Sequence, residues 1–383
     1  MRKTFYFPVW FTLLIWLSMP AAQAASTVTP TQTARLIMLA KPGVSDAAGW
    51  AMDLHTVLAA QDMPPERQNV CAAIAVIAQE SGFVANPVVP NLGKISEAAI
   101  RAKFGRIPFA GDMAVSWLES HPTPDANFMA RIRAAKTERD LDLTYRAMVA
   151  YAGKTSNLDV VLQLGLLNQV IEERNQINTV GSMQVAVKFA LDEERKSRWM
   201  PMSLNDVYAV RDRLYTREGG MYYGIKQLLG YDTGYAQKIF RFADYNAGRY
   251  ASRNAAFQAL VSKLSGIKLS ADGDLLSYDK KGEALAVVTN SEKALRALSQ
   301  KRGLGLDAKQ IRKDLLLEKA QGFAGTQTFL AVRALADGQA SPFAMVPQIA
   351  LNSPKLRNGF TTARFADRVN GRYQACMAAK LAP

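Results

Sequence analysis

Hydrophobic residues along most of the chain recur with the three- to four-residue spacing that is typical of amphipathic helices. In Arg67–Ser81, for example, Val70, Ile74 and Ile77 repeat at this spacing, and alanines fill positions between them. We therefore predict a mainly α fold. The helices are expected at Ala47–Gln61, Arg67–Ser81, Ser96–Phe104, Ala114–Glu119, Ala126–Ala135, Glu138–Ala152, Asn157–Glu173, Ser182–Phe189, Leu204–Leu214, Met221–Leu229, Tyr235–Asp244, Arg249–Lys263, Ser291–Lys301 and Ala308–Gly322.

Two regions depart from this helical pattern. The stretch 25–45 begins with a run rich in Ser, Thr and Pro, Ser26–Thr33, which predicts a flexible leader. The only strand signal lies at Ile267–Val288, where Asp272-Gly273 and Lys281-Gly282 are typical turn residues. We expect a small hairpin or loop there.

The N-terminus has the three parts of a secretory signal peptide. Arg2 and Lys3 supply positive charge, Val9–Leu17 is apolar, and Ala22-Gln23-Ala24 is a small-x-small cleavage site. The alternative is an uncleaved anchor, but the apolar stretch is short for a membrane-spanning helix. No Cys follows it, which disfavours a lipoprotein, and no later segment approaches about 18 consecutive apolar residues. We expect cleavage near Ala24, export to the periplasm and no membrane span in the mature chain.

The composition is that of a globular protein, with 383 residues, 49% hydrophobic and 21% charged. The 47 basic and 33 acidic residues give a net charge of +14, and loss of Arg2 and Lys3 with the signal leaves +12. For an exported protein this excess favours anionic envelope polymers or membrane surfaces over nucleic acid as partners. A basic, solvated surface without a partner is the alternative.

The chain contains only two His and two Cys, which argues against a multi-ligand zinc site or an iron–sulfur cluster. We expect no metal or cofactor, and any chemistry is expected to use carboxylates. Export permits a disulfide between Cys71 and Cys376, although two buried free thiols would fit the sequence equally well. Cys71 lies nine residues before Glu80, on the opposite helix face, so a disulfide would hold Thr361–Cys376 against the back of that helix.

Glu80 lies near the end of the apolar helix predicted at Arg67–Ser81. Gly82 follows it and is expected to terminate the helix. Both desolvation and the negative end of the helix dipole disfavour a charged carboxylate there. These effects raise the pKa, as a general acid working near neutral pH requires. The alternative is that Glu80 simply faces water.

Two further motifs follow Glu80-Ser81 in the chain: Gly181-Ser182-Met183-Gln184 and Asp244-Tyr245-Asn246-Ala247-Gly248. In this order they resemble the motifs of soluble lytic transglycosylases and goose-type lysozymes, which are Glu-Ser, Gly-Leu-Met-Gln and Ala-Tyr-Asn-Ala-Gly. The resemblance implies a lysozyme-like helical core and cleavage of peptidoglycan between N-acetylmuramic acid and N-acetylglucosamine.

The resemblance also implies roles for individual residues. Glu80 would be the single catalytic acid/base, and the muramoyl 6-hydroxyl would close a 1,6-anhydro ring. The Tyr245 hydroxyl would hold Glu80, and Asn246 would brace its turn or touch the substrate. Ser81, Met183 and Gln184 would complete the substrate-binding residues.

The chain departs from the family pattern in three ways. Ser182 replaces Leu, Asp244 replaces Ala, and about a hundred residues separate the first two motifs. We therefore expect a catalytic domain at 46–262 that contains a helical insertion at about 94–175, which would form a wall or lid over the cleft. A C-terminal extension at 263–383 would follow it.

Several alternatives remain open at this stage. Glu172, Glu173 or Asp244 would permit lysozyme-like hydrolysis if one of them faces Glu80, or they are ordinary charges. Aromatic residues, Tyr222, Tyr223 and Tyr250, would either stack on sugar rings or pack in the core. The chain could also be a catalytically inactive peptidoglycan-binding protein, or an assembly partner at the cell envelope.

Overall fold

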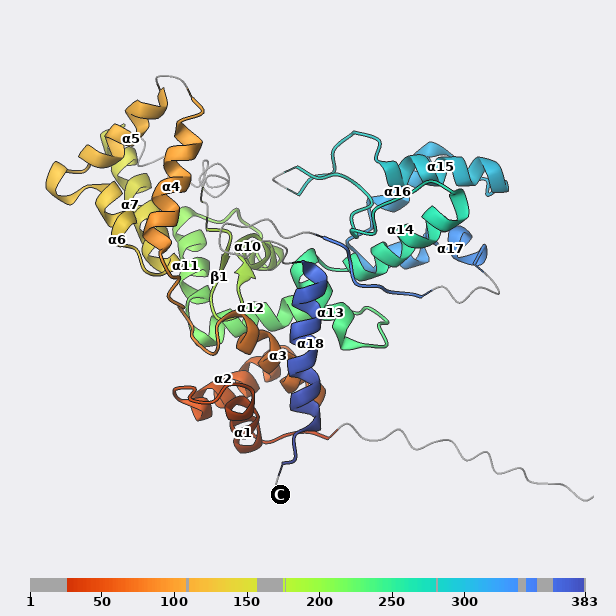
Figure 1. Ribbon diagram of the computed structural model, residues 1–383, viewed down its shortest axis with the longest axis horizontal. Coiled ribbons are helices and arrows are strands. Elements are labelled where there is room, and N and C mark those ends of the chain that lie inside the picture. Colours follow the sequence, from red (N-terminus) through yellow and green to blue (C-terminus); the bar gives the residue numbers. More distant parts are fainter. Residues whose placement is uncertain are drawn as a thin grey trace, which may run out of the picture.

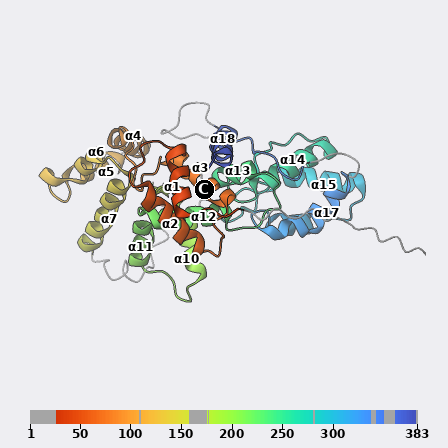
Figure 2. The ribbon, with the colours of Figure 1, turned by 90° about the horizontal axis from the view of Figure 1, so that it is seen from below.

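The computed structural model describes residues 26–107, 110–156, 175, 177–279, 282–336, 342–349 and 361–381. Within these ranges the protein is mainly helical, as predicted, with one two-stranded sheet. Three separate hydrophobic clusters divide it into a central part and two flanking parts. Figures 1 and 2 show the flanking parts, α4–α7 and α14–α17, on opposite sides of the central part.

The central part is built from segments at both ends and in the middle of the sequence (Figure 1). It comprises α1 (Pro30–Ala40), α2 (Ala47–Ala59), α3 (Arg67–Glu80), β1 (Thr179–Val180), β2 (Val185–Ala186), α10 (Val187–Lys196), α11 (Leu204–Leu214), α12 (Arg217–Leu229), α13 (Lys238–Ala247) and α18 (Thr362–Ala378).

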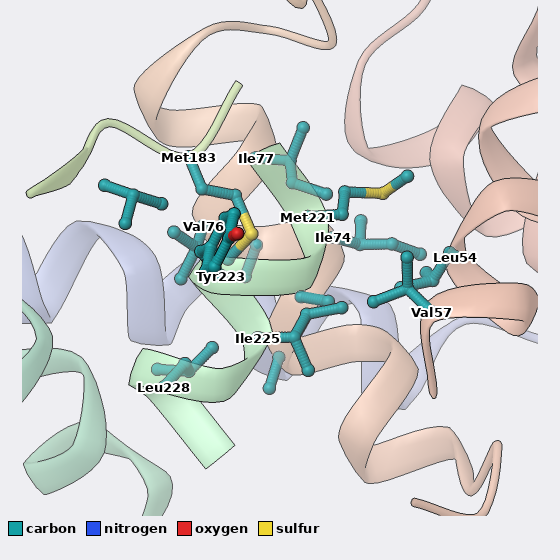
Figure 3. Packing of buried hydrophobic residues seen from close by; sticks show 14 of the residues in the cluster. Leu54, Val57, Ile74, Val76, Ile77, Met183, Met221, Tyr223, Ile225 and Leu228 are labelled. Atoms are coloured by element: carbon teal, nitrogen blue, oxygen red, sulfur yellow. The ribbon is translucent and has the colours of Figure 1, made fainter. Parts of the chain in front are cut away.

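Helix α3 lies at the middle of the central core, and every residue from Val70 to Ala78 is buried. Its alanines allow close approach of α1, α12 and α18, while its larger side chains fill the space between them. Figure 3 shows Ile74 and Ile77 of α3 beside residues of α2 and α12. Burying a helix on all sides in this way fixes its position tightly, including its C-terminal residue Glu80.

Helix α1 corrects the prediction that 25–45 is a flexible leader. Thr29 caps the helix through a reciprocal hydrogen-bonded pair with Gln32, and Pro30 occupies the first turn. Leu36 and Ile37 are buried against the core. The Ser/Thr/Pro-rich composition thus marks a helix start, because the residues that favour turns are also those that cap helices.

The first flanking part overlaps the stretch at about 94–175 where the sequence analysis expected a helical insertion. It comprises α4 (Leu92–Phe104), α5 (Ala110–Ser120), the short 3-10 helix η1 (Pro124–Ala126), α6 (Phe128–Ala134) and α7 (Glu138–Thr155). A small core of its own, with Leu118, Phe128 and Met129 buried, holds these helices together.

A buried ion pair fastens α7 to the central part. Asp142 of α7 is fully buried and accepts a hydrogen bond from Arg211 of α11 at 2.9 Å. It also accepts hydrogen bonds from Arg146 at 2.5 Å and from Asn175 at 3.0 Å. Removing one partner of such a pair would leave a buried charge uncompensated, so the network holds the first turns of α7 against α11.

The second flanking part comprises α14 (Ala251–Ser265), α15 (Asn290–Arg302), α16 (Ala308–Leu315), η2 (Gln321–Gly325) and α17 (Gln327–Ala334). Phe257 and Leu260 of α14 belong to this second core. The boundary therefore lies before α14, rather than at the predicted residue 262. Helix α17 was not predicted at all.

The predicted hairpin or loop at Ile267–Val288 is, in its described residues, a loop with one isolated antiparallel bridge, Tyr278 to Ala284. Glu318 accepts hydrogen bonds from the Tyr278 hydroxyl and from the backbone N–H of Leu275. A two-stranded hairpin that was not predicted is β1–β2, where Val180 pairs with Val185. It occupies part of the predicted helix Ser182–Phe189; the predicted helix Asn157–Glu173 lies outside the described residues.

The C-terminal helix α18 returns to the central part and packs on α3 and α13 (Figure 1). Cys71 and Cys376 form a disulfide with their Cα atoms 5.6 Å apart. Arg67 at the start of α3 also donates a 2.9 Å hydrogen bond to the carbonyl of Cys376. The C-terminal end of α18 is thus held against the first turns of α3.

A disulfide between two buried cysteines agrees with an oxidising compartment outside the cytoplasm. The predicted signal peptide and its cleavage site lie outside the described residues. In the part of the chain that is described, no helix combines the length and apolarity required to cross a membrane.

We predict that Cys71→Ser/Cys376→Ser lowers the free energy of unfolding by about 3 to 5 kcal/mol, because the bond closes a loop of 305 residues. Guanidinium unfolding of the variant and of the native protein, with and without reductant, measures this loss. Reductant should weaken only the native protein. Equal stability of the oxidised native protein and the variant would contradict the prediction.

Candidate functional site

The three sequence motifs meet at one cavity of about 1860 Å³, which is lined by both the central part and the first flanking part. Glu80, Gln184, Tyr245 and Asn246 all contribute to its lining. These residues come from the end of α3, the β1–β2 turn and the end of α13. The fold therefore brings together four of the six residues that the resemblance singled out.

Glu80 is the last residue of α3, and its side chain is only partly accessible from the cavity. Desolvation, together with the smaller effect of the nearby Glu138 charge, raises its pKa from the ordinary 4.5 to about 7. A carboxyl group with this pKa is protonated in a substantial fraction of molecules at neutral pH, so it can donate a proton and later accept one.

Glu138 is a second cavity-lining carboxylate that the sequence analysis missed. It is the first residue of α7, where the partial positive charge of a helix N-terminus attracts an anion, and only 4% of it is exposed. Its Oε2 accepts a 3.2 Å hydrogen bond from the Gln184 side chain. The signal in the sequence was weak, because a Glu after the capping Thr137 is common at exposed helix starts.

The β1–β2 turn places Gln184 at the cavity. Gly181 has φ +81°, and a Cβ there would lie 2.2 Å from the Leu214 carbonyl oxygen, so only glycine fits. Gln184 itself has φ +50°, which directs the chain sharply into β2. Thr179 donates a 3.2 Å hydrogen bond to Oε1 of Gln184, so both ends of the amide are held.

Tyr245 lies at the cavity, but its hydroxyl does not take the predicted role. It donates a 2.8 Å hydrogen bond to the carbonyl of Met183, which uses its only proton. Tyr245 is nevertheless close enough that the charge of Glu80 raises its pKa, after the larger effect of burial. Tyr245 therefore joins the second and third motifs and forms part of the wall beside Glu80.

Met183 and Ser81 differ from their predicted substrate-binding roles. Met183 is fully buried, and its sulfur packs tightly against Gly224, so its side chain belongs to the core (Figure 3). The Ser81 hydroxyl donates to the Ile77 carbonyl and accepts from the N–H of Val84, both at 3.3 Å. Ser81 thus terminates α3, and the competing backbone groups explain why it turns away from the cavity.

Asn246 lines the cavity and also braces the turn at the end of α13. Its Oδ1 accepts a 2.8 Å hydrogen bond from the hydroxyl of Thr362, the first residue of α18. The third motif therefore fixes the N-terminal end of α18 beside the cavity, while the disulfide fixes the other end.

Asp244, considered in the sequence analysis as a second cavity carboxylate, is buried away from the cavity. It accepts hydrogen bonds from the Tyr235 hydroxyl at 2.8 Å and from the N–H of Ser252 at 2.6 Å. Its carboxylate satisfies backbone donors at the start of α14, which explains why this chain has Asp where the resemblance implies Ala. Glu172 and Glu173 lie outside the described residues.

The tyrosines proposed to stack on sugars are not among the residues that line the cavity. Tyr223 is fully buried and donates a 2.6 Å hydrogen bond to Glu194. Tyr222 packs edge-on against it. Tyr250 is buried and donates a 2.9 Å hydrogen bond to the carbonyl of Asp232. All three have structural roles, and the core-packing alternative is the correct one.

The cavity walls differ in chemistry. The flanking helices α4–α7 contribute a mainly apolar wall, which includes Ile100, Phe104 and Trp117. Helix α18 contributes two arginines, Arg364 and Arg368, on the other side. Helices α4–α7 thus form a wall of the cavity, which also includes Lys103 and Glu138.

We predict that Glu80→Gln raises the free energy of unfolding at pH 8 but not at pH 4. The folded-state pKa of Glu80, about 7, exceeds its ordinary value of 4.5, so the native protein loses stability as pH rises between these values. The unfolding free energy of Glu80→Gln then exceeds that of the native protein by an amount that approaches about 3 kcal/mol above pH 7. Urea unfolding at several pH values measures it, with the exposed Glu283→Gln as control. Parallel pH dependence of the native protein and Glu80→Gln would contradict it.

Comparison with known proteins identifies the family. A family model described as "Protein of unknown function (DUF1615)" matches residues 43–379. The chain is 35% identical over 337 residues to the Uncharacterized protein YaiW of Escherichia coli (strain K12), which covers 87% of this chain and 86% of that protein. No solved structure matches the chain significantly, and nothing in the comparisons supports a lysozyme-like fold. The protein belongs to the family described as Protein of unknown function (DUF1615).

Proposed function

We propose that the protein is a peptidoglycan lytic transglycosylase that uses Glu80 as its acid/base. One observation carries the proposal: the Glu80 carboxyl group, with a pKa raised to about 7, reaches the cavity at which all three motifs of the resemblance converge. The raised pKa follows from burial at the end of α3 and from the charge of Glu138, so it is a property of the site itself.

The proposed reaction needs one carboxyl group for both proton transfers. Glu80 donates its proton to the glycosidic oxygen as the bond to the muramoyl C1 breaks. The resulting carboxylate then accepts the proton of the muramoyl 6-hydroxyl, whose oxygen bonds to C1 and forms the 1,6-anhydro ring. The proton lost in the first step is thus recovered in the second. No water enters, in contrast to the usual two-carboxylate hydrolysis.

The dimensions and lining of the cavity also support a polymeric substrate. Its volume of about 1860 Å³ exceeds the roughly 300–1,000 Å³ of sites for small molecules. Sugars have both apolar ring faces and polar hydroxyl groups. The apolar surface from α4–α7 and the fixed amide of Gln184 offer partners for each.

Glu138 favours a second candidate, hydrolysis by a lysozyme-like mechanism. It lines the same cavity as Glu80 and is close enough to influence its pKa. In that mechanism Glu138 would activate water as a base while Glu80 protonates the leaving oxygen. The products separate the two mechanisms, since hydrolysis leaves a reducing end and transglycosylation an anhydro end.

The first test of function is mass spectrometry of the soluble products released from purified sacculi. We expect anhydro-muropeptides from the native mature protein and at least a 1,000-fold lower rate from Glu80→Gln, because the acid is lost. Glu283→Gln, an exposed substitution of the same type, should retain the native rate.

Each other result has a definite meaning. Reducing-end products that depend on Glu80 would replace transglycosylation with the hydrolytic mechanism. Retained activity in Glu80→Gln would exclude the acid role of Glu80. Binding to sacculi without any product would support a catalytically inactive peptidoglycan-binding protein, and neither binding nor product would leave an assembly partner as the better hypothesis.

A second test uses Glu138→Gln. In a transglycosylase this variant keeps its turnover, but loss of the Glu138 charge lowers the pKa of Glu80. The fall in rate with rising pH, which reports deprotonation of Glu80, should then begin at a lower pH than in the native protein. Rates of product release between pH 5 and pH 9 measure this shift. Complete loss of activity at every pH would instead indicate that Glu138 is the base of a hydrolase.

A further inference from the structure

A second cavity, of about 470 Å³, lies where the start of α13 meets α18 and the start of α3. The loop that joins α12 to α13 completes its wall. Among the described residues, none lines both this cavity and the one at Glu80. Most of its lining side chains are polar, and its volume falls within the roughly 300–1,000 Å³ of small-molecule sites. The cavity therefore suits a small polar ligand.

Lys238, in the first turn of α13, is a partly buried cation that lines this cavity. Its ammonium group forms no hydrogen bond or ion pair with the residues that the structure describes. Burial lowers the pKa of Lys238, and the positive charge of Arg241 lowers it further, while the charge of Glu66 acts in the opposite direction. An ammonium group that is partly desolvated and lacks an acceptor costs free energy. An anion in the cavity would supply that acceptor.

Tyr373 of α18 brings a second polar group to the same cavity. The residue is only 8% exposed, and its ring packs edge-on against Phe242 of α13, with the ring centres 5.7 Å apart. Its hydroxyl forms no hydrogen bond with any described residue. The same holds for the side-chain amide of Asn370, which lies three residues earlier on the same face of α18. Core packing thus fixes a hydroxyl donor at the cavity.

Arg241 and Asp232 complete the charges that line the cavity. Arg241 is held by the carbonyls of Leu228 and Tyr231, at 3.2 and 3.0 Å, and a guanidinium group has further N–H donors beyond these two. Asp232 is the one acidic residue among the described lining residues, and its Oδ2 accepts a 3.1 Å hydrogen bond from Gln321. Two cations against one anion leave the lining with an excess of positive charge.

We propose that this cavity binds a small organic anion, whose carboxylate or phosphate group is held jointly by the Lys238 ammonium and the Tyr373 hydroxyl. Hydrogen bonds that involve a charged group are roughly twice as strong as neutral ones, so these two contacts supply most of the affinity. The amide of Asn370 then bonds to polar atoms in the rest of the ligand. The site is separate from the Glu80 cavity, and the inference does not depend on the proposed function.

Calorimetry at low ionic strength tests the site with succinate, with glycerol 3-phosphate and with uncharged glycerol. We expect at least one of the two anions to bind and glycerol not to bind, and the tighter anion identifies the preferred group. Lys238→Gln should weaken binding by about tenfold or more, because it removes the charge. Tyr373→Phe should weaken it about threefold, because it removes one hydrogen bond. Lys293→Gln changes an exposed lysine that lines neither cavity and should keep the native affinity.

The basic residues of the Glu80 cavity are the competing location for these anions. Lys103 lines that cavity, so Lys103→Gln should leave the affinity for succinate and glycerol 3-phosphate unchanged. Binding that survives Lys238→Gln, or that is lost in Lys103→Gln, places the anion elsewhere and overturns the proposal. Failure of both anions to bind the native protein overturns it as well.

A second measurement needs no substitution. An anion beside Lys238 stabilises the charged ammonium and raises its pKa, and only the neutral amine reacts with acylating reagents. Trace acylation of the native protein, followed by peptide mass spectrometry, should therefore show slower modification of Lys238 when the anion is present. Lys293 is the internal control and should react at an unchanged rate. Equal rates at Lys238 with and without the anion overturn the site, whatever products the protein releases from sacculi.

Discussion

Helix α3 is buried on every side along Val70–Ala78, and it ends with a carboxyl group at a cavity. The apolar sides of the helix drive it into the core, and this burial carries Glu80 to a place where its charged form is poorly solvated. The pKa near 7 is the consequence. The same packing that stabilises the fold therefore creates a group able to exchange protons near neutral pH.

The rest of the site is arranged around this fixed helix by contacts that are distant in sequence. The disulfide to Cys376 holds the C-terminal end of α18 against α3, and the Tyr245–Met183 hydrogen bond joins two of the motifs beside Glu80. On the other side, the buried pair of Asp142 and Arg211 fastens α7 to the central part. Each contact limits the movement of one cavity wall relative to Glu80, which is the condition for a preorganised site.

Sequence patterns predicted well where a local rule coincided with the tertiary contacts. The apolar periodicity of Arg67–Ser81 predicted α3 to within a residue. The expected rise in the pKa of Glu80 followed from its place at the end of that buried helix. The predictions failed where one local signal has two outcomes. Ser-, Thr- and Pro-rich residues before α1 cap a helix instead of forming a flexible leader, and Ser182–Gln184, predicted to begin a helix, form the turn between β1 and β2.

The sequence by itself determined the mainly α class and the helix that carries Glu80, because helical periodicity and burial are properties of neighbouring residues. It left the pairing of the cysteines open, and it did not reveal Glu138, since nothing near that residue marks it as different from a surface charge. Only the tertiary structure decided these points. Side chains separated by tens or hundreds of residues become neighbours through the packing of whole helices, and no local pattern specifies that packing.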